Sequence, residues 1–177
     1  ATGTCTVSGT TVTLSGAAGT CTVTASQGGD ATYNAAPNVS QAFTVSKVSQ
    51  TITFNALPNK LVTDPPFPIS ATASSGLSVT FTSATTSLCT VSGPTVTLTQ
   101  TSGTCTINAN QAGDAIYNAA PQVSQSFSVN KLTQTITFGA LPDKLRDDPS
   151  FTVSATADSG LIVTFTASGS CSASGTT

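Results

Sequence analysis

The chain has 177 residues, but only five are Lys or Arg and seven are Asp, and Glu, His, Trp and Met do not occur. Five scattered cations and a net charge of −2 give no electrostatic footprint for DNA or RNA, so we expect no nucleic-acid partner. Without His, most metal sites and the Ser-His and Cys-His nucleophiles are unavailable, so we expect no metal, no cofactor and no catalytic centre.

Alternation with a period of two predicts short half-buried strands throughout the chain, separated by Gly, Pro, Asn or Asp. No apolar run approaches the roughly 18 residues of a membrane span. The clearest predicted strands cover residues 52–54, 67–73, 77–81, 89–91, 96–98, 105–109 and 127–129. Their inward positions predict one core, made of Phe54, Ile69, Val79, Phe81, Val96, Leu98, Ile107 and Phe127.

An internal repeat of 84 residues organises these strands. Residues 50–61 recur as residues 134–145, and residues 29–37 recur as residues 113–121. About seven strands per repeat of ~84 residues predict an all-β chain of tandem immunoglobulin-like sandwiches. Residues 1–47 are then the C-terminal half of one repeat, residues 48–131 a complete repeat, and residues 132–177 the N-terminal part of the next.

The last residues of the chain, 167–177, also match residues 1–11. We therefore expect the chain to be a window from a longer array. A partial sandwich exposes apolar faces and strand edges, so each partial repeat should be completed by neighbouring sequence. That sequence would come from the same polypeptide or from an adjacent copy in a fibre, and we expect the former.

The five cysteines follow the repeat. Cys5 and Cys21 are separated by the same gap as Cys89 and Cys105, and all four fall on the inward parity. Redox and zinc sites would need a CxxC motif or four clustered ligands, so we predict two structural disulfides and an oxidising compartment. Cys171 should be unpaired in this window.

A polar loop motif is also repeated, as Asp30, Tyr33 and Asn34 and again as Asp114, Tyr117 and Asn118. One interpretation is a ligand or calcium site. The other, which we favour, is a turn in which Asp accepts backbone hydrogen bonds while Tyr packs over an edge of the fold.

A second charged cluster contains Asp143, Lys144, Arg146, Asp147 and Asp148, whose carboxylates could hold a weakly bound calcium ion. The counterpart segment, residues 59–64, has lost most of the acids. We therefore favour a solvated loop.

The ordered motifs Cys-Thr-Val-Ser-Gly, Gly-Thr-Cys-Thr, Gly-Asp-Ala-x-Tyr-Asn-Ala-Ala and Gln-Thr-Ile-Thr-Phe resemble those of tandem bacterial Ig-like repeats. Such repeats occur in long extracellular and surface-anchored proteins, and the resemblance implies a stalk, spacer or adhesive module without catalytic residues. We expect a structural segment of an extracellular filament or adhesin stalk, forming a disulfide-stabilised rod, whose partners are neighbouring repeats or adjacent copies.

The alternative function is an adhesive module that binds a surface carbohydrate or a receptor, although the chain has no Trp and only two Tyr for such contacts. An enzyme is disfavoured, because the complete repeat holds only two carboxylates, Asp64 and Asp114. A glycosidase would need an opposed pair of them at one site.

Overall fold

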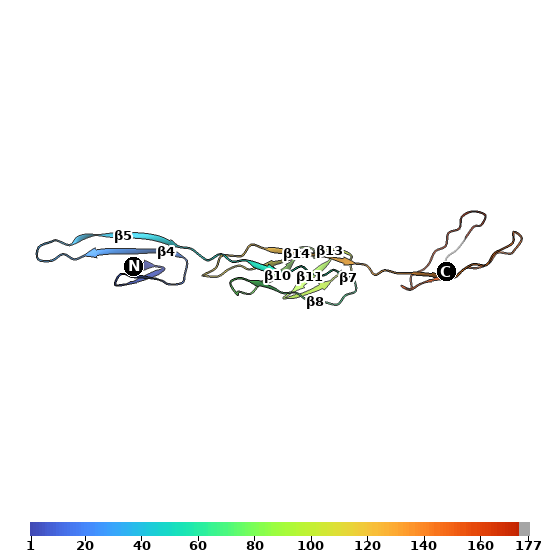
Figure 1. The fold of residues 1–177 in the computed structure, drawn as a ribbon, viewed down its shortest axis with the longest axis horizontal. Helices are drawn as coiled ribbons and strands as arrows, with labels where there is room; N and C mark the ends of the chain where they lie inside the picture. The colour runs from blue at the N-terminus through green and yellow to red at the C-terminus, as the bar shows by residue number, and fades with distance from the viewer. Residues whose placement is uncertain (174–177) are drawn as a thin grey trace. The chain divides into compact units, whose positions relative to one another are not determined.

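The computed structural model describes residues 1–173, and all regular structure in that range is β-strand, which confirms the all-β prediction (Figure 1). The chain divides into two compact units, Ala1–Asn130 and a second that begins at Lys131. A helix long and apolar enough to span a membrane is not found in the described part of the chain.

The largest sheet of the first unit lies in residues 60–130 and has four strands, in the order β10-β13-β14-β7. Three of them are antiparallel neighbours, and the short β7 pairs parallel with the end of β14. Their bounds are Thr80–Ser83 for β10, Gly103–Asn110 for β13, Val123–Asn130 for β14 and Lys60–Leu61 for β7.

Two smaller sheets complete this middle repeat. The first has the order β11-β12-β8, with β11 at Cys89–Ser92, β12 at Thr95–Leu98 and β8 at Phe67–Pro68. The second pairs β6 (Ile52–Phe54) with β9 (Ala71–Ala73). The β11–β12 hairpin turns at Gly93 and Pro94, where Gly93 has a φ of 56° that a residue without a Cβ adopts at little cost.

One hydrophobic core joins the three sheets, because alternate residues of each strand point to the same side. Most of the predicted core positions are buried, and the core also includes both cysteines of this repeat. Val96, Ile107 and Val129 are almost completely shielded from solvent. The buried set is Ile52, Phe54, Ile69, Cys89, Val96, Leu98, Cys105, Ile107, Ala109, Phe127 and Val129.

Several details of the predicted strands are wrong. Residues 67–73 do not form one strand, because β8 pairs with β12 while β9 pairs with β6, so the chain changes sheet at Ile69. Only residues from Thr80 onward form β10. Phe81 on this edge strand does point to the core as predicted, where it is partly buried against Phe54. Val79 packs against the core in the same partial way.

Residues 1–47 contain counterparts of the later strands only. The strand β4 (Gly19–Gln27) lies between β1 (Thr2–Gly3) and β5 (Ala36–Val45), and β2 (Cys5–Ser8) pairs with β3 (Thr11–Leu14). The long β4 and β5 run side by side (Figure 1). We call these residues the first segment. Apolar side chains that are covered in the middle repeat are open here: Phe43 is 44% exposed, whereas its counterpart Phe127 is 3% exposed.

The unit that begins at Lys131 contains counterparts of the early strands. Here β15 (Ile136–Phe138) pairs with β16 (Ala155–Ala157) in the register of β6 and β9. Its inward side chains are also open, since Ile136 is 62% and Phe138 49% exposed. We call residues 131–173 the last segment. The final four residues of the predicted domain 132–177, which carry part of the match to residues 1–11, lie outside the described residues.

Candidate functional site: the repeated loop and the chain junction

The loop between β13 and β14 is organised by one carboxylate. Asp114 Oδ1 accepts hydrogen bonds from the backbone N–H groups of Ile116 and Tyr117, both at 2.8 Å. The Asp114 N–H donates back to the carbonyl of Tyr117 at 3.1 Å. This arrangement is an Asx turn, in which a short acidic side chain satisfies backbone donors that lie outside any sheet.

The preceding glycine is required by the same turn. Gly113 has a φ of 76°, and a Cβ at this position would lie 2.4 Å from the carbonyl oxygen of Tyr117. Any other residue would therefore meet both backbone strain and a steric clash with the main chain.

The loop of the first segment repeats this geometry. Asp30 Oδ1 accepts the N–H groups of Thr32 and Tyr33 at 2.8 Å, and Gly29 has a φ of 73°. The repeated motif thus forms the predicted Asp turn in both places, whereas the predicted packing of Tyr over an edge of the fold is not seen at Tyr33, which is 73% exposed.

Both aspartates are easier to ionise than an ordinary carboxyl group. Backbone hydrogen bonds from Tyr117 and Ile116 lower the pKa of Asp114, and those from Thr32 and Tyr33 lower the pKa of Asp30. Hydrogen bonds to the charged form favour that form, so each turn is completed when its carboxylate is ionised.

The loop of the middle repeat also holds the incoming chain from the first segment. Val48 pairs in parallel with Tyr117: the Val48 N–H donates to the carbonyl of Ile116 at 2.8 Å, and the Asn118 N–H donates to the carbonyl of Val48 at 2.9 Å. The Lys47 ammonium donates to the backbone carbonyl of Asp114 at 2.7 Å. These bonds fasten the first segment to the middle repeat by its backbone.

Gln50 fixes the same junction from inside. It is 3% exposed, and its Nε2 donates to Gln111 Oε1 and to the carbonyl of Asn118, both at 2.6 Å. Its Oε1 accepts the hydroxyl of Ser75. A buried carboxamide with both ends bonded is costly to remove, because the Asn118 carbonyl would lose its donor and the Ser75 hydroxyl its acceptor.

In the first segment, no strand within residues 1–173 pairs with the loop in the way that Val48 pairs with the loop of the middle repeat. Tyr33 is accordingly 73% exposed, whereas Tyr117 is half-buried. The two loops are alike internally and differ in whether a neighbouring strand lies against them.

The disulfides join the same pairs that the equal spacing predicts. Cys5 is bonded to Cys21 and Cys89 to Cys105, with Cα atoms 5.5 Å and 6.0 Å apart. Each bridge ties the start of a hairpin to the long central strand of its repeat. Two such bonds indicate an oxidising environment. Cys171 is a free, exposed cysteine.

The acidic segment around residue 145 forms a local turn. Asp148 Oδ2 accepts the N–H of Leu145 at 3.0 Å, as Asp64 does for Leu61 at 3.1 Å. The Lys144 ammonium lies over the ring of Phe151, 5.0 Å from its centre. Within residues 1–173, His, Cys, Asp and Glu form no group of three or more that could hold a metal ion.

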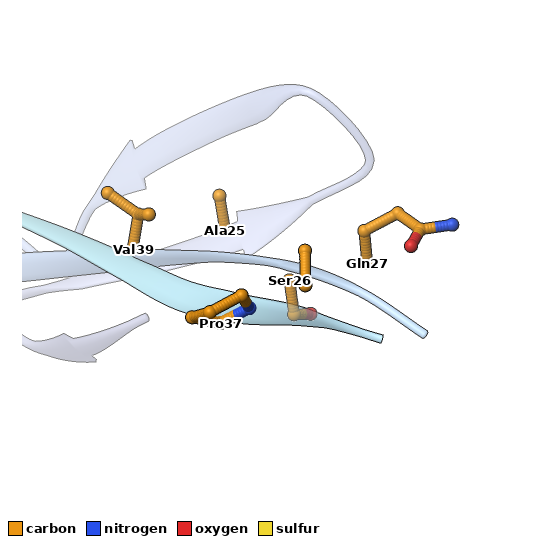
Figure 2. A pocket seen from close by; sticks show the side chains of 6 residues that line it. Ala25, Ser26, Gln27, Pro37 and Val39 are labelled. Atoms are coloured by element: carbon orange, nitrogen blue, oxygen red, sulfur yellow. The ribbon is translucent and has the colours of Figure 1, made fainter. Parts of the chain in front are cut away.

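A hollow of about 230 Å³ lies at the end of the β4–β5 pair (Figure 2). Ala25 and Val39 project to the same side of this pair, and Ser26, Gln27, Ala36 and Pro37 complete the lining. The counterpart of Ala25 in the middle repeat is Ala109, which is fully buried beside β10. The hollow is therefore part of the same open face.

No protein-family model, curated protein or solved structure matches the chain.

Sequence reasoning did not identify Gln50 as a junction residue, although it opens the repeated segment 50–61. A polar residue directly before an alternating strand is the signal that could have found it. The parallel pairing at Val48 joins residues far apart in the chain, and a single sequence carries no local sign of such a contact.

Proposed function

We propose that the chain is a structural repeat segment of a long extracellular bacterial filament or adhesin stalk, built from immunoglobulin-like β-sandwiches. The single observation that carries the proposal is the fastened junction at residues 47–50. A spacer must transmit position or force between successive repeats, and a short connection bonded into the next repeat has less freedom than an open linker.

The composition of the repeat supports the same function. Thr and Ser supply 59 of 177 residues, and many of them occupy outward positions of the strands. The hydroxyl groups of these residues hydrogen-bond to water, so the sheet surfaces are hydrated although they carry few charges. A buried disulfide in each repeat adds about 3 kcal/mol according to the loop-entropy treatment, which helps a repeat of ~84 residues remain folded outside the cell.

Nuclear spin relaxation of backbone amides tests whether the junction is rigid. We expect the β4–β5 and β13–β14 pairs to report one common rotational correlation time in the oxidised chain at low concentration. Gln50→Ala should separate the two values, because the buried carboxamide no longer links the loop to the connection. Gln134→Ala is the matched control, since Gln134 is the counterpart of Gln50 and is exposed. Independent tumbling of the two regions in the unaltered chain would contradict the spacer function.

The alternative function is an adhesive module for a surface glycan or receptor. The observation in its favour is Tyr33, whose ring is 73% exposed in the first segment. Exposed aromatic rings are common in carbohydrate contacts. Binding of the chain to a glycan array, abolished by Tyr33→Ala and retained in Tyr117→Ala, would support this function over the spacer.

A further inference from the structure

The uncovered face of the first segment closely copies a face that is covered elsewhere in the same molecule. Residues 1–47 match residues 85–131 at 30 of 47 positions. The side chains that line the core from β12, β13 and β14 all have apolar counterparts in the first segment. In β3, β4 and β5 these are Val12, Leu14, Val23, Ala25, Phe43 and Val45.

The strands that cover this face in the middle repeat are also present a second time. Residues 132–166 match residues 48–82 at 24 of 35 positions. The aromatic residues of the covering strands are retained, as Phe138, Phe151 and Phe165. Phe138 and Phe151 are about half exposed, so the last segment offers an open apolar face of its own.

We propose that, where the neighbouring sequence expected in the same polypeptide does not cover these faces, the last segment of one copy covers the first segment of a second copy, so that the chain assembles head to tail by strand complementation. The pairing reproduces between two chains the packing that residues 48–82 and 85–131 have within one chain. Addition of a strand to an open sheet edge is an established way for β proteins to associate. The proposal goes beyond the spacer function, because a chain whose segments never pair could still be a spacer.

The open edge of β4 sets the register. Within residues 1–173, β4 pairs on this side only with β1, at Cys21 and Thr22. In the middle repeat the equivalent edge is occupied by β10, with Phe81 opposite Ala109 and Thr82 opposite Asn108. The counterparts of the β10 residues lie 84 positions later in the chain, and those of the β13 residues lie 84 positions earlier. The same register therefore places Phe165 of one copy opposite Ala25 of the other, and Thr166 opposite Thr24.

Two further contacts follow from the same shift. The parallel pairing of Lys60 with Val129 becomes Lys144 with Val45. The antiparallel pairing of Phe67 with Val96 becomes Phe151 with Val12. Phe151 and Val12 are 51% and 41% exposed in the separate chain, and both would be covered in the pair.

The repeated loop receives its missing strand in this arrangement. Val48 pairs with Tyr117 in the middle repeat, so Leu132 of one copy would pair with Tyr33 of the other. Gln134 would donate to Gln27 and to the carbonyl of Asn34, as Gln50 donates to Gln111 and Asn118. Tyr33 would then become half-buried like Tyr117.

The proposed interface between two chains is less well packed than the equivalent packing inside the middle repeat. Ile107 and Ile69 are replaced by the smaller Val23 and Val153, which leaves less apolar contact at the centre. Val62, which packs against the core, is replaced by Arg146, whose aliphatic stem can cover the same surface while its charge remains in water. We therefore expect association to be weaker than the folding of the middle repeat, and to depend on concentration.

Sedimentation velocity on the 177-residue chain tests association first, with Cys171→Ser in every sample. Head-to-tail contacts do not close at the dimer, so the weight-average mass should rise steadily with concentration. Phe138→Asp should abolish the rise. Ile162→Asp should not, because Ile162 is 77% exposed and its counterpart Ser78 is exposed in the middle repeat. Equal loss in both variants, or a mass that stays that of the monomer, would overturn the proposal.

Directed disulfide formation tests the register and the second copy. Chains with Thr24→Cys are mixed with chains carrying Thr166→Cys, oxidised mildly, and mapped as non-reduced peptides. The 24–166 cross-link should exceed the 24–164 cross-link formed with Thr164→Cys, which lies two residues out of register on the same face. Equal yields would overturn the register. A single chain with both Thr24→Cys and Thr166→Cys that closes on itself at every concentration would overturn assembly between copies.

Discussion

The middle repeat and the first segment carry nearly the same strands and differ sharply in burial. Phe127 in β14 is 3% exposed and Leu98 in β12 is 9% exposed, whereas their counterparts Phe43 and Leu14 are 44% and 52% exposed. Strand pairing, the hairpin, the Asx turn and the disulfide are the same in both. These features therefore belong to the local sequence, whereas burial depends on the strands β6 to β10, which have no counterpart in residues 1–47.

The difference separates two kinds of stabilisation. Backbone pairing and cross-links form within residues 1–47 and again within residues 85–131. The hydrophobic contribution needs the strands of residues 52–83 as well, such as β10 opposite β13. A matched pair of substitutions at positions 84 residues apart can therefore measure the second contribution alone. All the following measurements use dilute chain, where the first segment has no second copy to cover it.

Phe127→Ala should have the largest effect. It removes a buried ring that contacts Phe67 with ring centres 5.7 Å apart, and we expect a loss of about 3–5 kcal/mol in the free energy of unfolding of the middle repeat. Phe43→Ala, the matched change on the open face, should cost less than about 1 kcal/mol. Urea unfolding followed by β14 and β5 amide signals measures both. Equal losses of unfolding free energy in the two variants would show that Phe43 and Phe127 are equally shielded from solvent.

Removing the Cys89–Cys105 bridge should have the next largest effect. The paired change Cys89→Ala and Cys105→Ala opens a loop with a sequence separation of 16, worth about 3 kcal/mol in the loop-entropy treatment. The change should lower the urea midpoint of the middle repeat with little change in the midpoint of the last segment, which contains no bridge. A midpoint that does not move would mean that the bridge adds no stability to this core.

Gln50→Ala should cost an intermediate amount, about 1–3 kcal/mol, because it leaves the Asn118 carbonyl without its donor and the Ser75 hydroxyl without its acceptor. Gln134→Ala at the exposed counterpart should change stability by less than about 0.5 kcal/mol. Thermal unfolding of the two variants side by side provides the measurement. A larger effect at Gln134 would contradict the assignment of the junction to the middle repeat.

The pH dependence should be the smallest effect. Backbone hydrogen bonds lower the folded pKa of Asp30 and Asp114, so their contribution is complete above the unfolded value of about 3.9 and is lost as pH falls through the folded value. The urea concentration at the midpoint of unfolding should therefore decrease when the pH is lowered below about 4. Asp114→Asn retains an acceptor for the turn and should reduce this dependence. An unchanged pH profile in this variant would exclude Asp114 as a source.

The period-two pattern was sufficient to predict the all-β fold, most of the core and the side of each strand on which the cysteines lie, because alternation is a local property. The sheet change at Ile69 was not predictable in the same way, since residues 67–73 alternate without interruption and only Pro68 hints at a break. The parallel contact of β7 with β14, and the junction at Gln50, join residues 60 or more positions apart. The repeated loop was recognised as a turn because Gly-Asp has a definite backbone role, but its hold on the incoming chain is a tertiary contact.

A comparison of amide hydrogen exchange in β4 and in β13 tests the central claim most directly. The claim is that the presence of covering strands, and not a difference in sequence, explains why the middle repeat is buried and the first segment is exposed. Residues 23–26 of β4 correspond to residues 107–110 of β13, where β10 lies alongside. In dilute chain the amides of Thr24 and Ser26, which point to the open edge, should exchange much faster than those of Asn108 and Asn110, which point to β10. Their exchange should slow as concentration rises and second copies supply the missing strand. Equally slow exchange in both strands at the lowest concentration would contradict the account.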